Sequence, residues 1–136
     1  VKRAQHALRL SMDRALRDVG LTMAQYALLR ALENQPDASN ADLSRACFVT
    51  PQTMIQTLRG LETAGLVSRR RHSSDRRVMT TTLTASGCAQ LSAAHRVVDA
   101  LESRMLTGIP EGDQQQLVSM LEAITANLAE DPSGAT

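Results

Sequence analysis

The densest group of charged side chains in the sequence lies in RRRHSSDRRV, residues 69–78. The segment holds five arginines, one histidine and one aspartate: Arg69, Arg70, Arg71, His72, Asp75, Arg76 and Arg77. Guanidinium groups bind phosphates through paired, charge-assisted hydrogen bonds, so the segment is a candidate for contact with a polyanion. A solvated surface loop is the alternative, because runs of charge are commonly exposed to solvent. Asp75 is expected to orient a nearby arginine or cap the turn rather than to act as a catalytic acid.

Charge is unevenly distributed along the chain, although the formal net charge is only +1. Residues 50–80 hold six basic and two acidic side chains, which gives this segment a charge of +4. The remaining residues hold nine basic and twelve acidic side chains, which gives them a charge of −3. A weakly acidic body with one basic segment indicates a single surface that meets a polyanion.

A second group of polar side chains lies in FVTPQTMIQTLRGLETAGLV, residues 48–67, just before the basic segment. Thr50 followed by Pro51 predicts a helix start, because a hydroxyl can cap the helix and a proline at the first position loses no hydrogen bond. The inward stripe of this helix is Met54, Leu58 and Leu61. Its opposite face carries polar side chains: Thr50, Gln52, Thr53, Gln56 and Arg59.

These polar side chains suit the edges of bases in the major groove of DNA. Glutamine can pair bidentately with adenine, threonine can meet a thymine methyl group, and Arg59 can reach a phosphate. A merely solvated helix face is the alternative, although such a face more often carries Lys and Glu. Ile55 is expected either to contact thymine methyl groups or to be buried.

The elements that position these residues can be predicted from apolar periodicity and capping signals. The spacing of Leu8, Met12, Ala15 and Val19 predicts a helix over residues 2–19, with Gly20 ending it. Thr22 is expected to cap a second helix that runs to about residue 34 and buries leucines on one face: Leu28, Leu29 and Leu32. Ser39 is expected to cap a short third helix, NADLSRAC, with Asp42 completing a shortened capping box.

Beyond Gly65, a candidate for the residue after the end of the fourth helix, the apolar period changes to two. Residues 66–71 and 78–83, joined by HSSD, are predicted to form a two-stranded hairpin. Alternation along the strand prevents Arg69, Arg70 and Arg71 from all meeting the same phosphate. Thr84 is expected to cap a long helix over about residues 85–107.

A final helix is predicted over about residues 113–129, and residues 130–136 are expected to be disordered. The last two helices carry apolar positions at steps of three and four: Leu91, Ala94, Val98, Leu101 and Met105, then Leu117, Leu121, Ile124 and Leu128. Together with the first helix they hold more apolar surface than one small subunit needs. We therefore expect a homodimer, with packing inside a monomer as the alternative.

Composition excludes several classes of function. The chain has 136 residues, enough for one domain or a domain with an oligomerisation extension. Tyr26 and Phe48 are its only aromatic residues, which argues against modules that stack single-stranded bases. The carboxylates and the three histidines are scattered, so the sequence predicts no catalytic site, no metal site and no cofactor. The absence of a long apolar run predicts a protein without a membrane span.

The two cysteines, Cys47 and Cys88, form no disulfide framework and no zinc spacing, which fits a reducing cytoplasm. Both are expected to be buried or indifferent thiols. A thiol switch at Cys88, early in the long helix, stays open.

Short capped helices followed at once by a basic hairpin have the order of a winged helix-turn-helix. LTMAQYALLRAL, TPQTMIQTLRGLETAGLVSRR and DRRVMTTTLTASG also resemble the multiple-antibiotic-resistance regulator (MarR) family of bacterial transcription factors. The likeness spans about Leu21–Gly87, and its most specific element is the Asp-x-Arg of the wing at Asp75 and Arg77. The chain departs from the family at Ile55 and Gln56, where relatives often carry a small hydroxyl residue and an arginine. The set of residues that reads bases therefore stays open.

The resemblance implies a homodimer whose first and last helices form the dimerisation lobe and whose wing arginine meets the minor groove. We expect a dimerisation region at residues 1–20 and 108–136, a winged helix-turn-helix at 21–84 and a linking helix at 85–107. The resemblance also implies an effector, because many relatives are repressors released by small, often anionic aromatic, ligands. Arg17 or Arg30 could anchor such an effector.

The sequence as a whole predicts a mainly α fold with a small β-hairpin wing. Its expected function is that of a cytoplasmic, homodimeric, sequence-specific DNA-binding regulator on a near-palindromic operator, with repression as the expected mode and activation left open. The alternative is a winged-helix module that binds an acidic protein surface and gives no sequence-selective footprint on DNA.

Overall fold

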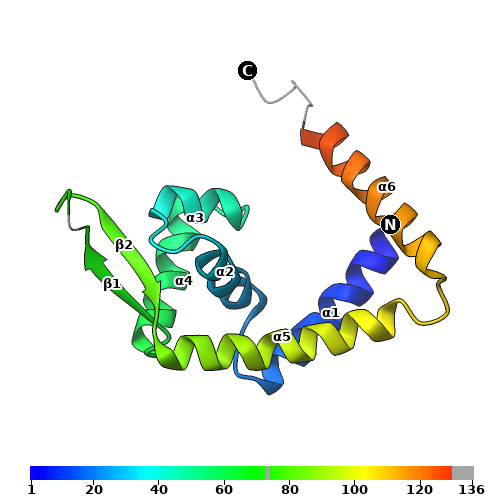
Figure 1. Cartoon of the computed structure of the whole chain (residues 1–136), viewed down its shortest axis with the longest axis horizontal. Helices are drawn as coiled ribbons and strands as arrows, with labels where there is room; N and C mark the ends of the chain where they lie inside the picture. Colours follow the sequence, from blue (N-terminus) through cyan, green and yellow to red (C-terminus); the bar gives the residue numbers. More distant parts are fainter. Residues whose placement is uncertain (73, 130–136) are drawn as a thin grey trace. The chain divides into compact units, whose positions relative to one another are not determined.

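The computed structural model describes residues 1–72 and 74–129. Within them the order is α1 (Lys2–Asp18), α2 (Met23–Asn34), α3 (Asn40–Ala46), α4 (Pro51–Thr63), β1 (Val67–Arg71), β2 (Met79–Leu83), α5 (Ala85–Met105) and α6 (Glu111–Ala129) (Figure 1). The mainly α fold with one hairpin is confirmed. The prediction for residues 130–136, and Ser73 of the predicted turn, lie outside the described residues. The chain divides into two units between Leu101 and Glu102.

The predicted helix starts are confirmed by their capping hydrogen bonds. The Thr22 hydroxyl accepts from the Gln25 backbone N–H, and the Gln25 side chain accepts from the Thr22 backbone N–H. Ser39 and Asp42 form the same reciprocal pair at the start of α3. At the start of α4, Thr50 caps the helix and Pro51 occupies its first turn. Each cap pairs an N–H that the helix itself cannot satisfy.

Three helices of the first unit end in the same backbone motif. Gly20 after α1 and Gly65 after α4 adopt left-handed backbone angles, with φ of +76° and +73°. In both, the amide of the glycine and the amide of the next residue return to carbonyls of the last turn, as in a Schellman motif. Helix α3 ends with the same two hydrogen bonds, but Phe48 occupies the glycine position with φ of +53°.

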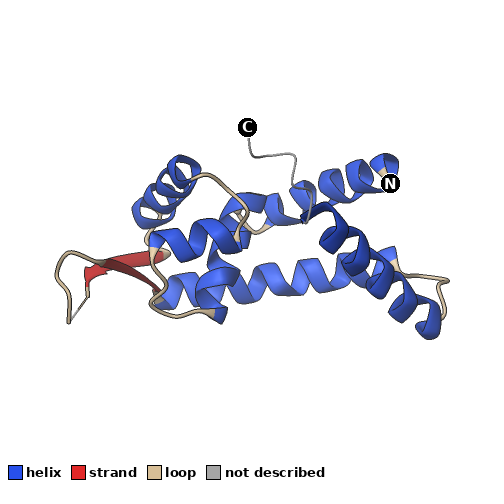
Figure 2. Cartoon of the chain, turned by 90° about the horizontal axis from the view of Figure 1, so that it is seen from above, coloured by secondary structure: helices blue, strands red, loops and turns tan. Residues whose placement is uncertain are grey.

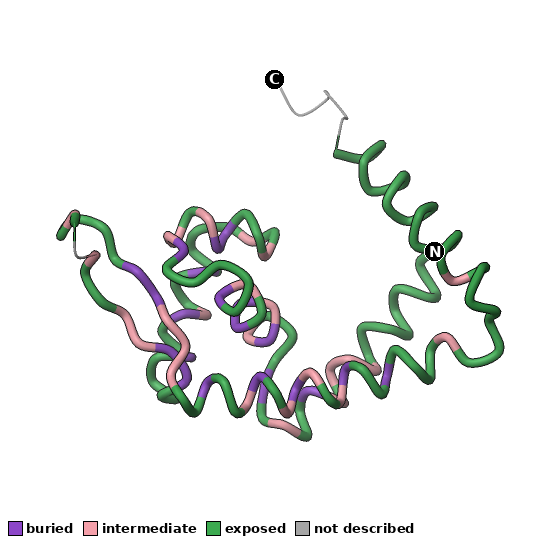
Figure 3. The backbone as a smooth tube through the Cα atoms, in the orientation of Figure 1, coloured by how far each residue is buried: buried purple, intermediate pink, exposed green. Residues whose placement is uncertain are grey.

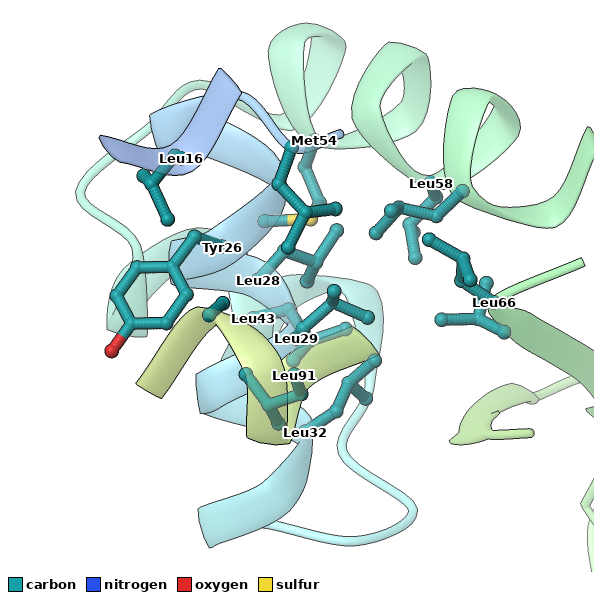
Figure 4. Packing of buried hydrophobic residues seen from close by; sticks show 14 of the residues in the cluster. Leu16, Tyr26, Leu28, Leu29, Leu32, Leu43, Met54, Leu58, Leu66 and Leu91 are labelled. Atoms are coloured by element: carbon teal, nitrogen blue, oxygen red, sulfur yellow. The ribbon is translucent and has the colours of Figure 1, made fainter. Parts of the chain in front are cut away.

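The core lies where α2, α3 and α4 pack on one another (Figure 4). The predicted inward stripes of α2 and α4 are confirmed, since all six leucine and methionine side chains are buried. The predicted helix over residues 2–19 is confirmed as Lys2–Asp18; within it Leu8 is 40% exposed and Leu16 is buried. Only the last turns of α1 reach the core, and there Leu16 also accepts the closing hydrogen bond from Leu21.

β1 and β2 pair antiparallel, with Val67 opposite Leu83 and Arg71 opposite Met79. The hairpin projects beyond α2, α3 and α4 in both views (Figures 1 and 2). Its base is held by Val67 and Thr81, which are buried, and by a hydroxyl–hydroxyl hydrogen bond of 3.1 Å between Ser68 and Thr82. The strand pairs therefore fix the direction in which the basic tip extends.

The end of α4, the hairpin and the start of α5 meet at one junction. The Thr84 hydroxyl donates to the Gly65 carbonyl at 2.6 Å, and the Thr84 amide donates to the Leu66 carbonyl at 3.1 Å. The same hydroxyl accepts from the Gly87 amide at 3.0 Å, which caps α5 as predicted. A Cβ on Gly87 would lie 2.0 Å from the Leu66 carbonyl oxygen. Only glycine permits this close approach.

The last two helices differ in burial. Four of the five predicted inner positions of α5 are buried within the chain, namely Leu91, Ala94, Val98 and Leu101. No residue of α6 is buried, and its predicted stripe is exposed along the whole helix (Figure 3). A shallow apolar hollow on the helix is lined mainly by Val118, Leu121, Thr125, Ala126 and Ala129. An apolar face of this length is typical of a helix that packs on a partner.

We expect the Gly87→Ala substitution to destabilise the fold by about 2–4 kcal/mol, because the new methyl group overlaps a backbone carbonyl that cannot move without breaking the junction. Urea unfolding at fixed protein concentration measures this loss. Gly60→Ala in α4 is the matched control, since its Cβ would meet only Gln25 at an ordinary 3.8 Å. The control should be neutral or stabilising by up to about 1 kcal/mol. Equal effects of the two substitutions would contradict the assigned role of the junction.

Candidate nucleic-acid interface

The outer face of α4 carries the five polar side chains singled out from the sequence, and all are exposed: Thr50, Gln52, Thr53, Gln56 and Arg59. Thr50 and Thr53 are already engaged with each other, because the Thr50 hydroxyl accepts from the Thr53 amide and donates to the Thr53 hydroxyl at 3.0 Å. Gln52, Gln56 and Arg59 make no side-chain hydrogen bond to another described residue. Their donors and acceptors are therefore available to an external partner.

Ile55 is 38% exposed, which removes the alternative that it is buried in the core. It lies between Met54, which is buried, and Gln56, which is exposed. The side chain therefore borders the polar face of α4. From that position Ile55 can make apolar contact with a DNA groove without any change in how α4 packs on the core.

At the tip of the hairpin, Asp75 orients Arg77, the arginine of the Asp-x-Arg pattern. One carboxylate oxygen of Asp75 accepts from the Arg77 backbone N–H at 3.0 Å and from the Arg77 Nε at 3.3 Å. The Arg77 side chain is nevertheless 91% exposed. The bond to Nε therefore holds the inner end of the Arg77 guanidinium, while the two terminal nitrogens of the group remain open to a ligand.

The other basic residues of the hairpin have different surroundings. Arg71 Nη1 donates to the Arg76 carbonyl at 3.4 Å across the turn, and Arg76 is exposed. His72 Nδ1 accepts from the Ser74 amide at 3.2 Å, which leaves Nε2 for a partner. Arg70 is exposed, whereas Arg69 lies opposite the buried Thr81 with its Nε buried and unpaired among the described residues. Arg69 is therefore less open to a ligand than its neighbours.

The residues expected to anchor an effector are not joined by any described contact. Arg17 is exposed in the last turn of α1, and Arg30 is exposed on α2. Neither makes a hydrogen bond or an ion pair with another residue of the described ranges. Both side chains are open to an anion, but among the described residues they do not form a shared binding site.

A polar contact that sequence reasoning missed links α2 to α5. The Tyr26 hydroxyl lies 3.0 Å from His95 Nδ1, and His95 Nε2 lies 2.8 Å from a carboxylate oxygen of Glu33. The two rings meet edge to face. Tyr26 and His95 are 69 positions apart. No local pattern in the sequence signals such a pair.

The pKa of Asp42 and the pKa of Cys47, both near the helix-turn-helix, differ from their ordinary values. The Ser39 side chain and amide, followed by Arg45, lower the pKa of Asp42. Burial raises the pKa of the Cys47 thiol, which lowers its thiolate fraction and its reactivity. Cys88 is exposed.

The described residues contain no cluster of three or more His, Cys, Asp or Glu side chains that could hold a metal ion. Among the same residues, no helix has both the length and the apolar character needed to cross a membrane.

Comparison with known proteins identifies the family. The MarR family profile matches residues 21–79. The HTH-type transcriptional repressor Rv2887 of Mycobacterium tuberculosis is 39% identical over 117 residues, which cover 86% of this chain and 84% of the relative.

Two solved structures extend the likeness to the fold. The transcriptional repressor CouR bound to a 23-mer DNA duplex matches with a TM-score of 0.85 and 30% identity, over 91% of this chain and 88% of that chain. The Mycobacterium tuberculosis MarR family protein Rv2887 in complex with p-aminosalicylic acid matches with a TM-score of 0.74 and 37% identity, over 91% of this chain and 94% of that chain. This chain, with its capped α4 and its Asp75-braced hairpin, belongs to the MarR family of transcriptional regulators.

Proposed function

We propose that the chain is a homodimeric, sequence-specific DNA-binding repressor in which α4 reads base edges and the hairpin holds the flanking backbone. The observation that supports this most strongly is the pairing of a capped helix that presents unengaged glutamines with an Arg77 that is braced yet open. Helices of this kind fit the major groove, and arginine is favoured in the narrower minor groove.

The expected operator follows from the two-fold symmetry of a dimer. Two copies of α4 would enter successive major grooves about 34 Å apart, so the half-sites should be related by a near-palindrome with a spacing of about ten base pairs. The domain limits proposed from the sequence assign residues 1–20 and 108–136 to dimerisation, 21–84 to DNA binding and 85–107 to the link between them. The exposed stripe of α6 supports this assignment.

Arg59, Arg70 and Arg71 are the proposed phosphate contacts, with His72 and the less open Arg69 beside them. Arg76 is proposed to lie with Arg77 in the flanking minor groove. Phosphate contacts position a protein on DNA without reading sequence and make its affinity fall with salt. Thr50 caps α4 and its hydroxyl is bonded to both the amide and the hydroxyl of Thr53, so base contact at these two positions is secondary to their role in the fold. Among the five polar residues of α4, Gln52 and Gln56 are the proposed base-reading pair.

Release of DNA by a small ligand is part of the proposal. Rv2887 has been crystallised with p-aminosalicylic acid and with salicylic acid, both of which carry an aromatic carboxylate. Arg17 and Arg30 are the proposed anchors for an anionic group in this chain. The protein is proposed to be regulatory rather than catalytic, and to act in the cytoplasm, where its two free cysteines would stay reduced.

The competing function is that of a protein-interaction module whose basic hairpin binds an acidic protein surface. The α4 face disfavours it, because two unengaged glutamines suit base edges better than an acidic surface. Selection from a random pool of duplexes separates the two functions. A DNA-reading protein enriches related near-palindromes, whereas an interaction module enriches none.

Arg77→Ala should weaken binding to the selected duplex about tenfold or more, because the loss of one arginine contact in a DNA groove costs about 1–3 kcal/mol of binding free energy. The melting temperature of the protein should not fall. Gel-shift titration and thermal unfolding measure the two effects. Arg96→Ala, which removes an exposed arginine of α5, is the matched control and should leave affinity within about twofold. Unchanged affinity in the Arg77 variant would refute the assignment of the wing.

For the Asp75→Ala variant, an orienting role and a net-charge role of Asp75 predict opposite changes in DNA affinity. Removing an acid from a DNA-facing hairpin should strengthen binding if long-range charge dominates. If Asp75 braces Arg77, the loss of both hydrogen bonds frees the guanidinium and affinity should fall by about three- to tenfold, which corresponds to roughly 0.7–1.4 kcal/mol. Tighter binding by this variant would show that Asp75 does not position Arg77.

Substitution of Gln52 or Gln56 by Ala should change which bases are preferred, at about 1–3 kcal/mol for each bidentate contact that is lost. Repeating the duplex selection with each variant shows which position of the half-site relaxes. A uniform loss of affinity over all sequences would instead assign the glutamine to the DNA backbone.

A further inference from the structure

The turn between α3 and α4 exposes one of the two aromatic side chains of the protein. Phe48 is 94% exposed, whereas Tyr26 is buried. It lies two residues before Thr50, the cap of α4, so the two Cα atoms are at most about 7 Å apart. The phenyl ring is thus carried at the start of the helix that presents the unengaged glutamines.

The backbone at Phe48 is left-handed, a conformation that glycine adopts after α1 and α4; the other described non-glycine residue with positive φ is Asp37, whose short polar side chain tolerates it. The Phe48 amide donates to the Arg45 carbonyl at 3.3 Å, and the Val49 amide donates to the Ser44 carbonyl at 3.1 Å. Gly20 and Gly65 make the equivalent bonds at the ends of α1 and α4. A residue with a Cβ is strained in the left-handed region, and phenylalanine has no polar group that could compensate locally.

Folding does not account for a phenylalanine at this position. The apolar contact that accompanies the motif is supplied by the following residue, Val49, which packs against the core. The phenyl ring itself is almost fully in water, so it contributes no burial to the fold. The strain and the exposure both indicate that this side chain is kept for an external contact.

We propose that Phe48 packs on a thymine C5 methyl group in the major groove and so contributes to operator affinity and specificity. This inference rests on the proposed function, because it places α4 in that groove. The major groove is about 12 Å wide, so a ring so close to the start of α4 lies within reach of its floor or edge. The thymine methyl is the apolar group that the bases present there, and phenylalanine suits it.

The first test compares stability with affinity. Phe48→Gly and Phe48→Asn both suit a left-handed backbone, so their melting temperatures at fixed protein concentration should be unchanged or higher by about 2–4 °C. Their affinity for a duplex selected from a random pool by the unsubstituted protein should fall by about five- to thirtyfold, the loss expected for an exposed aromatic contact. A side chain needed only for the fold would lower the melting temperature instead.

The second test identifies the group that is contacted. Each thymine of the selected half-site is replaced in turn by deoxyuridine, which lacks the C5 methyl group. The unsubstituted protein should lose about fourfold in affinity at one thymine, and Phe48→Gly should lose nothing at that position.

Three outcomes would overturn the inference while leaving the proposed function intact. They are full affinity in both Phe48 variants, a melting temperature lowered by about 5 °C or more, and equal deoxyuridine effects with and without the phenyl ring. Failure of the unsubstituted protein to enrich any duplex would contradict the proposed function itself, and this inference with it.

Discussion

The geometry of the proposed DNA-binding region depends on the hydrogen-bonded junction around Thr84. There the end of α4, the first residue before β1 and the start of α5 are held by bonds from Thr84 to Gly65 and Leu66. The approach is possible because Gly87 has no side chain at the point of closest contact. Since α4 and the hairpin both leave from this junction, it fixes the angle between the proposed reading helix and the proposed wing. The strand pairs of the hairpin then fix the direction in which its basic tip extends from the junction.

Polar groups in this region divide into those that build the fold and those left for a partner. Thr22, Ser39, Thr50 and Thr84 are used by helix caps, where each satisfies an otherwise unpaired N–H. Gln52, Gln56 and the outer end of Arg77 have no such use. Phe48 belongs with the second group, because its conformation and exposure work against stability. Exposed residues that contribute to neither the core nor a helix cap therefore identify the proposed interface better than the distribution of charge does.

Local signals explain why so much of the fold could be predicted from the sequence. The Thr50–Pro51 start, the stripe through Met54 and Leu58 and the change of period near Leu66 all act over a few residues, and all were confirmed. Periodicity places an apolar stripe on α1 but does not show that only its last turns reach the core, where Leu16 is buried. The Tyr26–His95–Glu33 contact joins distant segments that meet only after folding. The strain at Phe48 is equally invisible in the sequence, since an ordinary turn could hold the same residue.

Hydroxyl-radical footprinting of the protein on its own selected duplex tests the central claim most directly, because it reports the position of every backbone contact. A dimer that reads DNA through α4 and the hairpin should protect two half-sites about ten base pairs apart, with further protection in the flanking minor grooves. Protection of the two half-sites should appear at protein concentrations that leave an unrelated duplex unprotected. Uniform protection along any duplex, or none at all, would contradict sequence-specific reading by this fold.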